Sequence, residues 1–244
     1  MLKKIITALG NSYKRDAKFP YLKANVLTVR NVEYLKKALG WENDPILEGD
    51  HLYSFQYLED LNDRPLRDAE VLGTACCNGD PKILLEIGTS HGKTTAMMAK
   101  NAQGGTVYTV NIPPEEIGEG GKNVTFAPSL DTIGKYYRDK GCENVKQILA
   151  NTANWEPDFG PIDIAFIDGC HDVEFVYNDT RKILKQCRPG SIIMWHDFNP
   201  DLCRVHHWIE DVCRGVERLY SAGLIKGRIL HLQDSWVGLY MVGK

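Results

Sequence analysis

The sequence predicts a doubly wound α/β fold, with a mostly parallel sheet of seven strands, an antiparallel last strand and a helical N-terminal extension. From Lys82 onward, short runs with a β pattern alternate with helical runs, which is typical of strands joined by crossover helices. The strand runs are almost entirely apolar, as expected for parallel strands covered on both faces. Only Asp234-Ser235-Trp236 separates the last two strand runs, so these are expected to form an antiparallel hairpin.

The alternation assigns each strand and helix between Lys82 and Lys244. The predicted strands are Ile83–Glu86, Thr106–Val110, Val145–Leu149, Ile162–Ile167, Ser191–Trp195, Arg228–Gln233 and Val237–Val242. The predicted helices between them are His91–Ala102, Ser129–Lys140, Val173–Gln186 and Leu202–Ala222. In open sheets of this kind the ligand binds at the carboxyl ends of the strands, so the residues that follow the strands are the candidates for chemistry.

Residues 1–79 are predicted to be helical and to contain no strand. Val32–Leu39 has a helical spacing of apolar residues, and Arg67–Cys77 is a second such run, closed by Asn78-Gly79-Asp80-Pro81. No linker rich in Ser or Pro follows, so this extension is expected to pack on the domain formed by residues 80–244. It would cover a binding pocket there or build a homo-oligomer through its helices.

Composition argues against several classes of partner and site. The 244 residues have a net charge of −3 and a pI of about 6.2, which recommends neither nucleic acid nor an anionic membrane as a partner. No apolar run approaches the roughly 20 residues of a membrane helix. The seven cysteines form no CxxC pair, so we interpret them as reduced thiols of a cytoplasmic enzyme.

The stretch LLEIGTSHGKTT, residues 84–95, imitates a phosphate-binding loop without fulfilling its spacing. A P-loop needs four residues between its glycines, so that backbone N–H groups can surround a phosphate. Gly88 and Gly92 are separated by only three residues, and this shorter ring of amides disfavours a P-loop ATPase. The dinucleotide fingerprint G-x-G-x-x-G is also absent, because Ser90 stands at its second glycine position.

Three segments in order carry a resemblance to a known family. They are Glu86-Ile87-Gly88-Thr89-Ser90-His91-Gly92, then Asp163 to Glu174 (DIAFIDGCHDVE), then Pro189 to Phe198 (PGSIIMWHDF). Together they resemble the class I S-adenosylmethionine-dependent methyltransferases, and in particular the small-molecule O-methyltransferases that include the macrolide-sugar enzymes. The resemblance implies a Rossmann-like fold and methyl transfer from S-adenosylmethionine to a hydroxyl of a small-molecule acceptor. The acceptor itself stays open.

The resemblance also implies the residues that hold the cofactor S-adenosylmethionine. They are Glu86, Gly88, Thr89, Ser90, His91, Gly92, Asn111, Asn151, Thr152 and Asp168. Asn111 departs from the family, which usually has an acid there to hold the ribose hydroxyls, and Asn151 departs in the same way near the adenine. An amide accepts hydroxyl hydrogens less strongly than a carboxylate, so a non-catalytic domain that keeps the methyltransferase fold is the alternative.

Four polar side chains follow two neighbouring strands of the predicted sheet: Asp168 and His171 after one, His196 and Asp197 after the other. Carboxylates and imidazoles at the ligand side of a sheet suit a divalent metal or acid–base chemistry. The alternative is that His196 and Asp197 only cap the next helix. By resemblance, Asp168, His196 and Asp197 would hold magnesium or another divalent cation, and His171 would be the general base. The predicted catalytic residues are therefore His171, Asp168 and His196.

Overall fold

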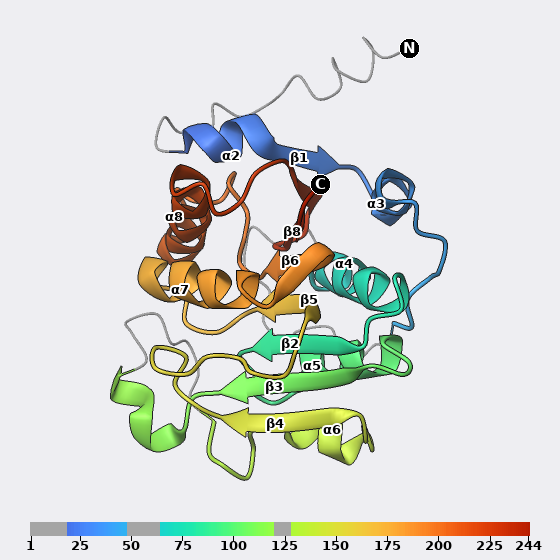
Figure 1. Ribbon diagram of the computed structural model, residues 1–244, viewed down its shortest axis with the longest axis vertical. Coiled ribbons are helices and arrows are strands. Elements are labelled where there is room, and N and C mark those ends of the chain that lie inside the picture. Colours follow the sequence, from blue (N-terminus) through green and yellow to red (C-terminus); the bar gives the residue numbers. More distant parts are fainter. Residues whose placement is uncertain (1–18, 48–63, 120–127) are drawn as a thin grey trace.

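The computed structural model describes residues 19–47, 64–119 and 128–244, and its centre is one twisted sheet (Figure 1). The eight strands lie in the order β1-β7-β8-β6-β5-β2-β3-β4. Their bounds are β1 Val26–Val29, β2 Ile83–Ile87, β3 Thr106–Asn111, β4 Val145–Leu149, β5 Ile162–Ile167, β6 Cys187–Trp195, β7 Ile229–Leu232 and β8 Gly238–Met241. All pairs are parallel except those of β8, which is antiparallel to both β6 and β7. The predicted doubly wound α/β class and its closing hairpin are confirmed.

Helices cover both faces of the sheet (Figure 1). One face packs against α7 (Val173–Leu184) and α8 (His207–Ser221), and α2 (Pro20–Asn25) lies against α8. The other face packs against α4 (Arg64–Cys77) and α5 (Lys93–Asn101), and α3 (Val32–Leu39) lies against α4. Because apolar side chains alternate between these two layers along each central strand, the strands read as continuous apolar runs.

The prediction that residues 1–79 contain no strand is wrong. Val26–Val29 forms β1, which pairs in parallel with β7 and adds an eighth strand to the predicted seven. The run VLTV is only four residues long and lies between helices α2 and α3, so local periodicity could not separate it from them. Residues 1–18 and 48–63 of the extension lie outside the described residues.

Two predicted helices begin much later than expected, whereas α5 begins only two residues after the predicted His91. The helix predicted from Leu202 begins at His207, because Asn199 accepts a hydrogen bond from the backbone N–H of Asp201 and turns occupy the residues between. The helix predicted over Ser129–Lys140 is reduced to α6, Lys135–Asp139. Gly134, just before it, has φ +66°, and this left-handed conformation interrupts a helix.

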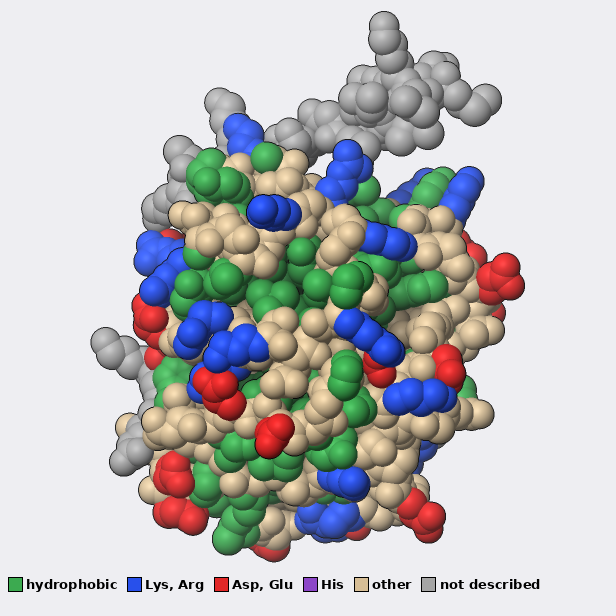
Figure 2. Space-filling model, in the orientation of Figure 1, with side chains coloured by type: hydrophobic (Ala, Val, Ile, Leu, Met, Phe, Trp, Pro, Cys, Tyr) green, Lys and Arg blue, Asp and Glu red, His purple; other side chains and the backbone are tan. Residues whose placement is uncertain are grey.

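Surface charge, helix hydropathy and the state of the cysteines can be compared with what the composition predicts. Lys and Arg occur together with Asp and Glu across the face shown in Figure 2, so neither sign covers it alone. None of the described helices is both long and apolar enough to span a bilayer. All seven cysteines lie in described residues, and no disulfide joins them.

Candidate active site

The glycine loop between β2 and α5 is shaped by contacts within the protein. Gly88 has φ +103°, and a Cβ there would lie 2.0 Å from the backbone oxygen of Asp168, at the end of β5. Gly92 has φ +84°, and a Cβ there would lie 2.7 Å from the ring of Tyr137. Both positions therefore require glycine, since any side chain would be strained and would collide with a neighbouring segment. The loop is consequently held directly against the strand end that carries Asp168.

A buried network lies beneath this loop. The hydroxyl groups of Thr95 and Thr109 each donate to Oε2 of Glu86 at 2.5 Å, and Thr89 Oγ1 lies 2.7 Å from Thr109 Oγ1. Burial raises the pKa of Glu86 to about 8, although the two hydroxyl bonds act in the opposite direction. Glu86 is fully buried and Thr89 nearly so, and both side chains support the loop from beneath.

The two asparagines that depart from the family pattern are buried and bonded to backbone. Asn111, at the end of β3, accepts from the N–H of Ser90 at 2.9 Å and donates to the carbonyl of Ile112. Asn151 accepts from the N–H of Ala153 at 3.0 Å. An amide retains further hydrogen-bonding capacity after such contacts, so both side chains can still meet a ligand hydroxyl or ring nitrogen.

The remaining predicted cofactor residues lie around the same strand ends. Thr152 donates to the buried carboxyl of Asp179, whose pKa burial raises to about 7. His91 is exposed on the loop, and its carbonyl accepts from the N–H of Tyr136. The loop leads into α5, whose N-cap Gly92 offers no side chain to the amide groups of the first turn. These amides suit an anionic group such as the carboxylate of a methionine moiety.

The four predicted polar side chains after β5 and β6 do converge. His171 Nε2 lies 2.9 Å from Asp197 Oδ2 and 3.7 Å from Asp168 Oδ1. His196 Nδ1 lies 3.1 Å from Asp168 Oδ1 and 3.4 Å from Asp197 Oδ2. The two carboxylates thus stand between two imidazoles, and His171, His196 and Asp197 are buried. His171 Nδ1 has no hydrogen-bond partner among the residues that the structure describes.

Opposite charges in this cluster shift its pKa values strongly. Burial alone would lower the pKa of His171, but the charges and hydrogen bonds of Asp197 and Asp168 outweigh it and raise this pKa to about 10. Burial would raise the pKa of Asp197, but the charges of His196 and His171 hold it well below the usual range. His171 therefore carries a proton at neutral pH in this arrangement and can act as a base only when the carboxylate charge is offset.

Asp197 adopts a left-handed backbone conformation, which is uncommon outside glycine although Asp tolerates it better than most residues. Its φ is +50°, and the strand end is fixed on either side by bonds from His196 N to Ile167 O and from Phe198 N to Trp236 O. The next helix, α8, begins only at His207, so Asp197 does not cap it. This conformation directs the Asp197 side chain toward His171.

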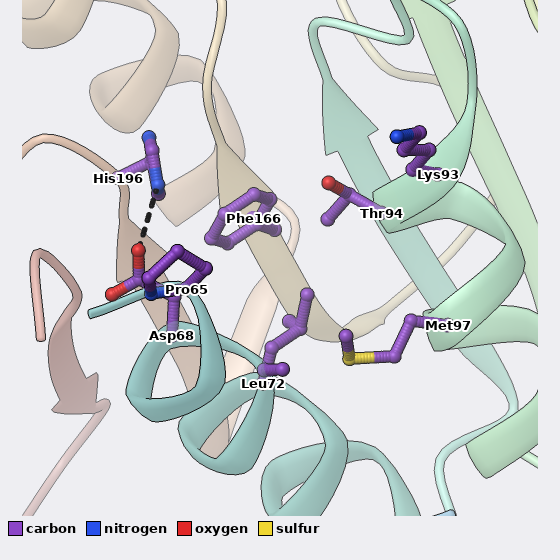
Figure 3. Close-up of a pocket in the computed structure, with 9 residues that line it drawn as sticks. Pro65, Asp68, Leu72, Lys93, Thr94, Met97, Phe166 and His196 are labelled. Atoms are coloured by element: carbon purple, nitrogen blue, oxygen red, sulfur yellow. Dashed lines mark hydrogen bonds and ion pairs between the residues drawn. The ribbon is translucent and has the colours of Figure 1, made fainter. Parts of the chain in front are cut away.

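One buried carboxylate of the cluster was not among the predicted site residues. Asp68 on α4 lies with its Oδ2 3.3 Å from His196 Nε2 (Figure 3). Both residues line a cavity of about 20 Å³, which is also bordered by Lys93 and Thr94 of α5. The sequence does contain one sign of it. Leu72 and Ala75 follow Asp68 by four and seven positions, so this charged residue lies on the apolar face of its helix.

The cluster offers the donor types that a divalent cation takes. Single donor atoms of Asp168, His171 and Asp197 all lie within 4.8 Å of one another. The imidazole–carboxylate separations of 2.9 to 3.7 Å are ion-pair distances, and they span the roughly 3 Å that separates neighbouring octahedral ligands of magnesium. The predicted set used His196 with the two carboxylates, and the structure brings both imidazoles within reach. Asp168 and Asp197 would therefore hold the cation, together with either ring.

Comparison with known proteins places these motifs in one family model. Residues 85–198 match a model described as a methyltransferase domain, and this range contains all three motifs in full. The resemblance to class I S-adenosylmethionine-dependent methyltransferases is confirmed. No curated protein sequence matches the chain.

Solved structures share the fold at low sequence identity. Cofactor-bound Rv0187 from MTB is 16% identical, with 98% of this chain and 95% of that chain covered and a TM-score of 0.53. The O-methyltransferase NovP is 17% identical over 70% of this chain and 78% of its own, with a TM-score of 0.53. The SAH-bound methyltransferase PaMTH1 of Podospora anserina is 16% identical over 98% and 94%, with a TM-score of 0.50.

Proposed function

We propose that this chain, which carries a methyltransferase domain at residues 85–198, transfers a methyl group from S-adenosylmethionine to a hydroxyl group of a small-molecule acceptor. The observation that carries the proposal is the position of the polar cluster. Asp168 follows the strand against which the Gly88 loop is pressed, so a cofactor on that loop would lie beside the cluster. The cluster is completed by His171, His196 and Asp197, and its imidazole nitrogens lie 2.9 to 3.7 Å from its carboxylate oxygens.

The reaction sets a clear task for these residues. The acceptor oxygen attacks the methyl carbon, the carbon–sulfur bond breaks with its electron pair moving to sulfur, and the hydroxyl proton must leave. Sulfur departs as a neutral thioether, so the difficult part is deprotonation of the acceptor. A bound divalent cation would supply Lewis-acid polarisation of the acceptor oxygen and offset the carboxylate charge.

His171 is the residue proposed to receive the proton. Its ring lies between Asp197 and Asp168, which orient it and hold its charged form. General-base assistance of this kind contributes about 10²- to 10⁴-fold to a rate. Burial of His171, His196 and Asp197 excludes water from the place where the proton moves.

The domain division is also a proposal. We assign residues 80–244 to the methyltransferase domain and residues 1–79 to an extension that completes its site. The support lies in β1, which joins the sheet beside β7, and in the contact of Asp68 with His196. An oligomer built through the N-terminal helices stays a prediction.

A transfer assay tests the proposal. The chain is incubated with isotopically labelled S-adenosylmethionine, magnesium and a panel of catechols, phenols and sugar glycosides, and labelled product is identified by mass spectrometry. We expect methylated product that disappears on addition of a chelator. Cofactor binding without any turnover across the panel would favour the non-catalytic alternative, and hydrolysis of ATP would favour the P-loop ATPase that the loop spacing disfavours.

A further inference from the structure

Asp68 reaches the cluster from a different part of the chain than the other members. It lies on α4, in the N-terminal extension, while its partner His196 lies 128 positions further along the sequence at the end of β6. Asp68 is only 6% exposed, and Figure 3 shows its carboxylate directed at the imidazole of His196. The extension therefore supplies a charged group to the candidate site.

Each oxygen of this carboxylate has a defined role. Oδ1 accepts from the backbone N–H of Trp236 at 2.6 Å. Oδ2 lies 3.2 Å from Nη1 of Arg64 and 3.3 Å from Nε2 of His196. Arg64 is itself placed over the Trp236 ring, 4.4 Å from its centroid. The carboxylate is thus fixed by a backbone donor and a guanidinium, and it cannot turn away from His196.

This fixed carboxylate determines which nitrogen of His196 carries a proton. An ionised carboxylate only accepts hydrogen bonds, so Nε2 must be the donor toward Asp68. In the neutral ring, Nδ1 then bears the lone pair, and Nδ1 faces Asp168 and Asp197 at 3.1 and 3.4 Å. A histidine that offers a lone pair to a cation commonly donates its other N–H to a carboxylate in this way.

We propose that Asp68 is a positioning residue, which holds His196 with Nδ1 presented as a metal ligand beside Asp168 and Asp197. The inference rests on the proposed function, because it assumes that a divalent cation binds at these carboxylates. The N-terminal extension would then contribute to cation binding, in addition to covering the site. A positioning role also explains why α4 carries a charged residue on its buried face.

The substitution Asp68→Asn reverses the hydrogen bond while keeping the shape of the side chain. The asparagine has one oxygen for donors on two sides, and the Trp236 N–H contact at 2.6 Å is shorter than the Arg64 contact at 3.2 Å. We therefore expect the oxygen to stay with the Trp236 N–H, so that the amide NH₂ faces His196 and the Arg64 guanidinium is displaced. An N–H donor at that position favours a proton on Nδ1 of His196, which removes the lone pair from the cation site. We expect a loss of about 10- to 100-fold in cation affinity, the usual effect of removing such a supporting carboxylate.

Asp163→Asn is the matched control. Asp163 also accepts backbone N–H bonds, from Lys82 and Ile83, and also pairs with an arginine, Arg188. It lies near the start of β5, at the opposite edge of the sheet from the cluster. A role limited to folding would lower stability in both variants without lowering the cation affinity of the folded Asp68→Asn protein.

The experiment is a titration of the wild type and both variants with Mn²⁺, followed by electron paramagnetic resonance, with thermal melting measured in parallel. Weakened binding in Asp68→Asn alone supports the inference, and equal affinity in all three proteins overturns it. Absence of any Mn²⁺ binding by the wild type would instead refute the metal part of the proposed function.

A second measurement needs no variant. The ¹⁵N spectrum of the His196 ring in the metal-loaded wild type reports which nitrogen is protonated. A proton on Nε2 alone agrees with the inference, whereas a proton on Nδ1 contradicts it. A proton on Nδ1 overturns the inference even when Asp68→Asn fails to fold.

Discussion

Replacing Glu86 with glutamine should make the protein more stable at alkaline pH and should change the slope of its pH–stability curve. Glu86 is fully buried beneath the glycine loop, and burial raises its pKa from an ordinary value of 4.5 to about 8. Below its pKa in the unfolded chain the carboxyl is protonated in both states. As pH rises, the unfolded chain releases the proton while the native protein retains it, so wild-type stability falls until the pH reaches about 8.

The magnitude follows from the size of that interval. Between about pH 5 and about pH 8 the native state holds one extra proton over about three pH units, at about 1.36 kcal/mol per unit. Glutamine cannot ionise, and its oxygen can still accept from Thr95 and Thr109. The difference in unfolding free energy between Glu86→Gln and the wild type should therefore increase by about 4 kcal/mol across this range. At about 2 to 4 °C per kcal/mol, the melting temperatures should diverge by roughly 8 to 16 °C.

The assay is urea unfolding of both proteins at several pH values, followed by far-ultraviolet circular dichroism. All other titrating groups are shared, so they cancel in the difference between variant and wild type. Glu33→Gln is the control, because that side chain is 70% exposed and should give parallel curves. Parallel curves for Glu86→Gln as well would refute the reasoning, since they would mean that Glu86 is ionised in the native protein.

Three further predictions concern the site. Gly88→Ala should weaken binding of both cofactor and cation in calorimetry, because its Cβ would push against the Asp168 backbone. Gly223→Ala is the control and should bind normally, since Gly223 also has a positive φ, +67°, but has open space around its Cβ. His171→Ala should lower turnover by about 10²- to 10⁴-fold with little change in cofactor affinity, and an unchanged rate would exclude it as the base. A chain that starts near Asn78 should aggregate or lose activity, because it lacks β1 and the Asp68 carboxylate of α4. Light scattering and the transfer assay measure this, and a stable, fully active fragment would contradict the prediction.

The central sheet could be predicted because its signals are local. The observed β4 and β5 have the predicted bounds, since each is a single β-type run separated from its neighbours by turns or loops. The bounds of α3 were also predicted, since Asn31 caps its start and Gly40 ends it in a left-handed conformation. Glycine, asparagine and apolar spacing are visible without any knowledge of distant contacts.

The features that were missed depend on distant contacts. Strand β1 is recognisable only through its pairing with β7, about 200 residues away. Four members of the polar cluster could be predicted, because the carboxyl ends of parallel strands meet at one edge of a sheet. Asp68 comes from a helix on one face of that sheet, and nothing in the neighbourhood of Asp68 specifies His196 as its partner.

Calorimetric titration of the wild-type chain with S-adenosylhomocysteine tests the central claim most directly, since a methyltransferase must bind the product of its donor whatever its acceptor. The account predicts saturable binding at one site that Gly88→Ala weakens and that ATP does not compete for. No heat at millimolar ligand would contradict it. So would tight binding of magnesium–ATP that Lys93→Ala abolishes, because the glycine loop would then hold a phosphate.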